Sequence, residues 1–76
     1  GGEALPTLAV PEGSIALADA LVGLGFASSK KEARRLIAQG GARVDGEAVT
    51  DEQAMVPIAG QVRISSGKKK HGLLTS

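Results

Sequence analysis

The stretch from Ser29 to Gly41 carries a start signal and a stop signal for one helix, and this pair constrains the fold more than any other feature. Ser29 is followed three residues later by Glu32, a capping box in which each side chain accepts a hydrogen bond from the other residue's free amide. Gly40 and Gly41 then supply the residue types that end helices in a left-handed turn. The sequence therefore predicts a helix that begins after Ser29 and ends before Gly40.

This helix separates apolar from charged side chains. At about 100° per residue, one face is apolar, and we expect it to meet a preceding helix; it consists of Ala33, Leu36 and Ile37. Four cations follow one another around the solvent side, here named the helix stripe: Lys30, Lys31, Arg34 and Arg35. Lys30 and Lys31 lie beside the positive end of the helix macrodipole, where each cation costs roughly 0.3 to 1 kcal/mol. Because folding gains nothing from them, and free amides also attract anions, the stripe favours phosphate binding over a merely solvated face.

A second helix is predicted just upstream. Ser14 is a capping residue type, and leucines follow at helical spacing, at positions 17, 21 and 24. Gly25 occupies the position after the helix end, where a left-handed residue is favoured, and Phe26 should fold back toward Leu21. We expect Phe26 to serve packing.

The remainder of the chain favours strands. Residues 42–49 enclose Asp45-Gly46, the pair typical of a two-residue type I′ hairpin. Residues 50–60 are predicted to be irregular, with at most one helical turn. The end of the chain should form a strand over 61–64, a turn over 65–67 and a last strand over 68–74. The order of elements predicts an α+β fold in which a helix pair packs on a small, mostly antiparallel sheet.

Domain boundaries follow from composition. Residues 1–13 contain Pro6 and Pro11 and no periodicity, which predicts an extended, flexible linker or tail. Residues 14–74 form the predicted domain, and residues 75–76 are its C-terminal end. With 76 residues the chain has room for one small core. It opens with Gly rather than Met, and we expect it to be a segment of a longer protein.

Composition excludes several classes of function. The chain has no Cys and one His, which excludes a disulfide framework and thiolate or imidazole-rich metal sites. Phe26 is the single aromatic residue, so RNA binding through an aromatic stacking platform is excluded. The longest apolar stretch, residues 15–27, is interrupted by Asp19 and is shorter than the roughly 18 residues that a membrane-crossing helix needs.

No set of residues indicates catalysis in this chain. Ser28 and Ser29 are better explained as residues at a helix start, and His71 has no nucleophile at a spacing that would nominate a pair. Asp51 and Glu52 are adjacent and point to opposite sides of an extended segment, which makes a poor acid and base pair.

Charge is distributed unevenly along the chain. Residues 1–29 contain three acidic residues and no Lys or Arg, whereas residues 30–76 contain all nine Lys and Arg against five acidic residues. Lys68, Lys69 and Lys70 form a second basic cluster. With the helix stripe, Arg43 and Arg63, this cluster could form one wall of a positive groove, which is typical of nucleic-acid binding through the backbone.

These residues resemble a known family. The run from Phe26 to Gly41, followed by Arg43 to Gly46 and later Gly67 to Lys69, resembles the S-four RNA-binding domain. Within that group, the fit is closest to the C-terminal domain of bacterial tyrosyl-tRNA synthetases. The resemblance spans residues 14–74. His71 departs from it, since it lies where an apolar or aromatic residue of the last strand is expected.

The resemblance implies a function and a set of contacts. In the synthetases this domain follows the catalytic body and holds tyrosine tRNA near its anticodon stem and long variable arm. The RNA-binding residues implied here are Lys30, Lys31, Arg34, Arg35, Gln39, Arg43, Lys68, Lys69 and Lys70. No cofactor is expected in this domain, whereas the parent enzyme, a cytoplasmic and homodimeric tyrosine–tRNA ligase, would use ATP and magnesium. No membrane partner is expected.

Two alternatives stay open at this point. The same module could belong to a pseudouridine synthase, an RNA methyltransferase or a ribosome-associated factor. In the other alternative the positive face docks onto an acidic protein or a lipid surface, with no nucleic acid involved.

Overall fold

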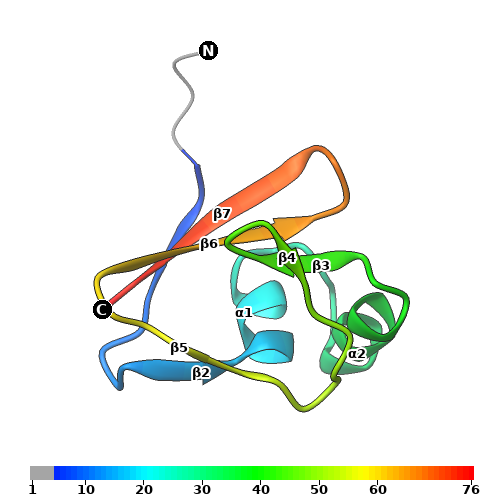
Figure 1. Cartoon of the computed structure of the whole chain (residues 1–76), viewed down its shortest axis with the longest axis horizontal. Helices are drawn as coiled ribbons and strands as arrows, with labels where there is room; N and C mark the ends of the chain where they lie inside the picture. The colour runs from blue at the N-terminus through cyan, green and yellow to red at the C-terminus, as the bar shows by residue number, and fades with distance from the viewer. Residues whose placement is uncertain (1–4) are drawn as a thin grey trace.

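The computed structural model describes residues 5–76, which form two helices and seven short strands (Figure 1). The elements in chain order are β1 (Thr7–Ala9), β2 (Ser14–Ala16), α1 (Leu17–Gly23), α2 (Lys30–Ala38), β3 (Ala42–Val44), β4 (Glu47–Ala48), β5 (Met55–Pro57), β6 (Gln61–Ser66) and β7 (Lys70–Thr75). Neither helix is long and apolar enough to cross a membrane within the described part of the chain.

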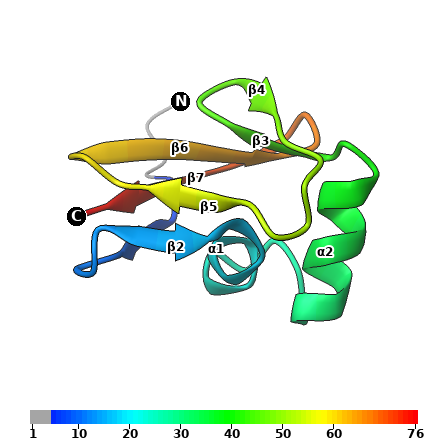
Figure 2. The same cartoon turned by 60° about the horizontal axis from the view of Figure 1, so that its bottom comes forward.

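Five strands form the main sheet, in the order β1-β7-β6-β3-β4. All neighbours in it are antiparallel except β1 and β7, which run parallel. Strands β2 and β5 form a separate antiparallel pair. Figure 2 shows α1 beneath the main sheet and α2 beside it, at the end where β3 begins. The α+β prediction of a helix pair on a mostly antiparallel sheet is therefore confirmed.

The core lies between the main sheet and the helices. Ile64 of β6 and Leu74 of β7 are fully buried, together with Leu17 and Leu21 of α1 and Ile37 of α2. Because side chains alternate along a strand, Arg63 and Ser65 of β6 and His71 of β7 point to the opposite, outer face of the sheet. That outer face carries the polar side chains considered below.

The predicted start of the first helix was wrong, and its end was confirmed. Ser14 does not cap α1, because residues 14–16 pair with β5 and are extended. The first helical amide, that of Leu17, donates instead to the Ala54 carbonyl at 2.9 Å. At the other end Gly25 has a φ of 81°, and the Phe26 amide donates to the Leu21 carbonyl at 2.9 Å. This is the Schellman ending that the sequence predicted.

The bounds of α2 were predicted correctly. The Glu32 amide donates to the Ser29 hydroxyl at 3.2 Å, which is half of the capping box. The other half differs, since the Glu32 carboxylate accepts a hydrogen bond from the Ser28 hydroxyl. Gly40 has a φ of 78°, and the Gly41 amide donates to the Leu36 carbonyl at 2.9 Å, so this helix also ends in a Schellman motif.

The hairpin over residues 42–49 is confirmed, with Asp45 at a φ of 50° and Gly46 at 87°, as a type I′ turn requires. The irregular segment 50–60 was partly mispredicted, because Met55–Pro57 is strand β5. The last turn lies two residues later than predicted, since β6 continues through Ser66. Strand β5 has only three residues, which is too short for local periodicity to reveal it.

The prediction of a flexible linker over residues 1–13 was wrong where the structure describes this segment. Thr7–Ala9 pairs with β7, and the Val10 amide donates to the Thr75 carbonyl at 2.6 Å. Val10 itself is 3% exposed and belongs to the core. Residues 1–4 lie outside the described residues. The fold therefore includes residues upstream of position 14, because β7 would otherwise leave an edge unpaired.

Candidate nucleic-acid interface

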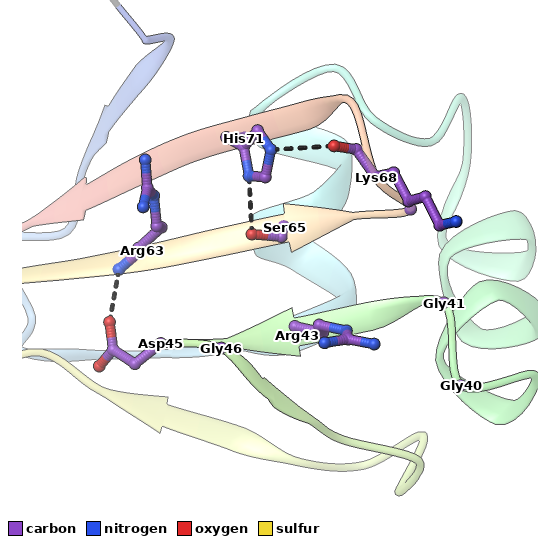
Figure 3. Close-up of a pocket in the computed structure, with 10 residues that line it drawn as sticks. Gly40, Gly41, Arg43, Asp45, Gly46, Arg63, Ser65, Lys68 and His71 are labelled. Carbon is purple, nitrogen blue, oxygen red and sulfur yellow. Dashed lines mark hydrogen bonds between the residues drawn. The ribbon is translucent and has the colours of Figure 1, made fainter.

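A basic pocket of about 860 Å³ lies on the outer face of the main sheet (Figure 3). We name it the sheet pocket. Its lining residues are Gly40, Gly41, Arg43, Asp45, Gly46, Arg63, Ser65, Gly67, Lys68 and His71. These come from the end of α2, from β3 and its turn, from β6, and from β7 with the turn before it. Its electrostatics are dominated by two guanidinium groups and one ammonium group.

Strand register explains why distant residues meet in this pocket. Arg43 of β3 lies opposite Ser65 of β6, and Ser65 lies opposite His71 of β7. Residues paired across adjacent strands point to the same face, so the three side chains form one row. Ser65 Oγ lies 3.0 Å from His71 Nδ1, and His71 Nε2 lies 3.2 Å from the Lys68 carbonyl oxygen.

His71 thus faces the pocket, and the core-facing position next to it is Gly72. A Cβ atom on Gly72 would lie 3.0 Å from the methyl groups of Leu24 and 3.1 Å from the ring of Phe26. The last strand therefore buries Gly72 and Leu74, and the departure of His71 from the family pattern falls on the outer face.

Asp45 is the acidic residue of the sheet pocket, and its carboxylate is held by the backbone. Asp45 Oδ1 accepts a hydrogen bond from the Arg63 amide at 2.9 Å, while the Asp45 amide donates to the Arg63 carbonyl at 2.8 Å. This pair fastens the β3–β4 turn to β6. The pocket lining thus holds three cations, Arg43, Arg63 and Lys68, against this one carboxylate.

A second hollow, named here the helix pocket, lies between α2 and the start of β7. It is lined by Phe26, Ala27, Glu32, Arg35, Leu36, Gln39, Ser66 and Lys70. Arg35, Gln39 and Lys70, three of the predicted RNA-binding residues, are thereby brought together. Arg35 lies in the last turn of α2, where a cation also complements the negative end of the helix dipole.

The four cations of the helix stripe are all exposed, as predicted. One of them has a partner inside the molecule: Lys30 Nζ lies 3.1 Å from Asp19 Oδ1 of α1. Lys30 therefore has an acidic neighbour in the fold, and an exposed pair of this kind contributes little to stability. Lys31, Arg34 and Arg35 make no ion pair with the acidic side chains that the structure describes.

The two pockets flank the turn of residues 67–69. The Gly67 amide donates to the Gly41 carbonyl at 2.9 Å, which fastens this turn to the end of α2. Lys68 lies in the sheet pocket, Lys70 in the helix pocket, and Lys69 is exposed in the turn outside both linings. Arg35, Arg43, Lys68 and Lys70 thus line pockets that include the C-terminal end of α2, whereas Lys30 and Lys31 lie at its N-terminus.

Ser65 and His71 were not predicted as site residues. Ser65 was placed in a turn, and His71 was noted only as an unusual strand residue. Strand alternation would have placed Ser65 on the face of Arg63 had β6 been extended to Ser66. The opposition of Ser65 to His71 requires the β6–β7 register, which the sequence does not reveal.

Together, these features define a small S-four-like domain with a basic surface. The chain belongs to the family described as tyrosine–tRNA ligase SYY-like C-terminal domain, whose model matches residues 1–74.

Curated relatives agree with this assignment. A tyrosine–tRNA ligase of Novosphingobium aromaticivorans is 61% identical over 74 residues, which cover 96% of this chain and 18% of the relative. The enzyme of Zymomonas mobilis is 53% identical over 74 residues, with the same two shares of 96% and 18%. That of Aquifex aeolicus is 40% identical over 68 residues, or 90% of this chain and 17% of the relative. The chain thus spans less than a fifth of the length of these relatives.

Proposed function

We propose that this chain is the tRNA-binding domain of a tyrosine–tRNA ligase and holds tyrosine tRNA by its phosphate backbone, near the anticodon stem and long variable arm. The observation that carries the proposal is that five cations line two neighbouring pockets, with Arg43, Arg63 and Lys68 in the sheet pocket and Arg35 and Lys70 in the helix pocket. Guanidinium and ammonium groups in such an arrangement suit phosphates of a folded RNA.

We infer recognition of the RNA by its shape and backbone from the scarcity of aromatic side chains. Phe26 is the single aromatic side chain of the sequence, and it is half-buried against the core. Stacking of extruded bases is therefore a minor contribution, and phosphate contacts position the RNA. Lys31, Arg34 and Lys69 add exposed cations outside the two pocket linings, and Gln39 adds a neutral donor and acceptor in the helix pocket.

The same proposal assigns the domain to a parent enzyme. The relatives are tyrosine–tRNA ligases, which favours attachment to a synthetase over a pseudouridine synthase, an RNA methyltransferase or a ribosome-associated factor. Use of ATP and magnesium by the parent, its homodimeric state and its cytoplasmic location stay predictions. Within this domain the proposed work is to bind tRNA and to orient it toward a catalytic body.

A comparison of two variants with the same net charge tests the proposal. R34Q/R35Q removes two exposed cations from α2. S14E/A59E adds two acidic groups at exposed positions of β2 and the β5–β6 turn, at the end of the molecule away from α2 (Figure 2). Binding to a fluorescent transcript of bacterial tyrosine tRNA is measured by anisotropy. We expect R34Q/R35Q to weaken binding by about tenfold, at roughly 0.7 kcal/mol for each cation removed from the basic surface, and S14E/A59E by less than about twofold.

Equal weakening by both variants would show a general charge effect and contradict the helix stripe as an interface. Urea unfolding of both variants establishes that the fold is retained. Parallel titrations use a perfect RNA duplex and vesicles that contain phosphatidylserine. Tighter binding to the vesicles than to tRNA would favour the lipid-docking alternative and overturn the proposal.

A further inference from the structure

Ser65 and His71 form a polar pair at the floor of the sheet pocket that phosphate binding by Arg and Lys does not require. Ser65 is 6% exposed, so its hydroxyl group needs a hydrogen-bond partner within the protein. It has one in His71 Nδ1 at 3.0 Å, directly across the two strands. The pair therefore joins a hydroxyl group to the one side chain in the sequence that ordinarily changes charge between pH 5 and 8.

The surroundings fix how the neutral imidazole is protonated. Its Nε2 lies 3.2 Å from the Lys68 carbonyl oxygen, which can only accept a hydrogen bond. Nε2 therefore carries the proton of the neutral ring, and Nδ1 accepts from the Ser65 hydroxyl. In this state the Ser65 proton is directed at His71 and away from the pocket.

A second proton on His71 reverses this hydrogen bond. Nδ1–H then donates to Ser65 Oγ, and the hydroxyl proton becomes free to donate to a group in the pocket. The charged side chains that line the pocket with the ring come from other parts of the fold: Arg43 on β3, Arg63 on β6, Lys68 in the turn before β7, and Asp45 in the β3–β4 turn. A bound phosphate would add negative charge near the ring, and nearby negative charge favours the protonated imidazole.

We propose that Ser65 and His71, with Arg43 and Lys68, form a subsite for one RNA phosphodiester, and that RNA binding there is coupled to proton uptake by His71. The inference rests on the proposed function and adds a named subsite and a pH response to it. The direction of the pH response follows from the linkage between proton binding by His71 and phosphate binding. Because the protonated ring binds phosphate more tightly, the affinity for tRNA rises as the pH falls from 8 to 6.

The test measures tRNA affinity at pH 6 and pH 8 at constant ionic strength, for the 76-residue chain and two variants. H71Q keeps a side chain that can pair with Ser65 and the Lys68 carbonyl, and it stays neutral at both pH values. Every other titratable group is unchanged, so the difference between the two pH responses isolates the imidazole. We expect the native chain to gain roughly threefold to tenfold in affinity on acidification and H71Q to gain less than about 1.5-fold.

S65A supplies a second variant that retains the imidazole. It should lose more affinity at pH 6 than at pH 8, because the hydroxyl proton reaches the ligand only when His71 is charged. NMR of the imidazole nitrogens at pH 7 gives a direct readout, with a shift toward the imidazolium signal when tRNA is added. A native pH response in H71Q, or an imidazole signal that tRNA leaves unchanged, overturns the subsite and leaves the proposed function intact. Absence of tRNA binding by the native chain at both pH values overturns the proposed function itself.

Discussion

The salt dependence of tRNA binding gives a quantitative test of the sheet pocket. Five Lys and Arg side chains line the two pockets. If each neutralises one phosphate, a plot of log affinity against log salt should have a slope of about −4, from roughly 0.7 to 0.9 per phosphate. Affinity should then fall about 250-fold between 50 and 200 mM KCl. Neutralisation of Arg43 and Lys68 in R43Q/K68Q should reduce the slope to about −2.5, and the fall over the same range to about 30-fold.

Anisotropy titrations at four or more salt concentrations between 50 and 400 mM give both slopes. The S14E/A59E variant is the matched control, because it carries the same net charge as R43Q/K68Q with the pocket intact. We expect its slope to stay near −4 even where its affinity is lower. A slope of about −4 in R43Q/K68Q would refute the reasoning, because the two cations would then release no counterions and the pocket would lie away from the RNA.

Two further predictions concern the fold. V10A should lower the free energy of unfolding by about 2 kcal/mol, because two buried methyl groups are removed from a core residue, whereas E12A at an exposed position should change it by less than about 0.5 kcal/mol. Equal losses of stability for V10A and E12A in urea denaturation would support the interpretation of residues 1–13 as a linker. S29A should cost about 1 kcal/mol through loss of the α2 cap, which lowers the melting temperature by roughly 4 to 8 °C. S28A, which removes only an exposed hydrogen bond to Glu32, should cost less, and a larger loss in S28A than in S29A would show that the cap is misassigned.

The parts of the fold that the sequence predicted are those determined locally. Both Schellman endings and the Asp45-Gly46 turn depend on residues within about five positions of one another, and glycine is required there for its left-handed backbone. The α2 cap is likewise local, through the Ser29 hydroxyl and the Glu32 amide. Such signals need no knowledge of the rest of the chain.

The strands that were missed depend on distant partners. Thr7–Ala9 becomes a strand because β7, at the other end of the chain, offers an edge to it. Residues 14–16 were predicted to begin a helix, yet they pair with residues 55–57 and are extended. In each case three residues are too few to show a period of two, and Pro57 further argues against a strand. Tertiary pairing decided the structure against the local pattern.

The features of the candidate site also fall into local ones, which the sequence predicts, and ones that depend on distant partners. The sequence identified the exposed cations, because charge and helical spacing are local properties. It did not predict that Lys30 is paired with Asp19, nor that Arg43 and Lys68 share a pocket with His71, because both facts depend on how elements pack. Grouping of side chains on the sheet requires the register of β3, β6 and β7.

One backbone contact joins the end of α2 to the turn that carries two of the proposed RNA-binding residues: the hydrogen bond from the Gly67 amide to the Gly41 carbonyl. Gly41 completes the Schellman motif that ends α2, and Gly67 opens the turn that carries Lys68 and Lys69. The structure that terminates the helix therefore also fixes the start of the turn that carries these two cations. Since backbone hydrogen bonds set where these two residues leave the chain, the backbone needs no rearrangement for the proposed contacts to phosphate, which lowers the entropy cost of binding.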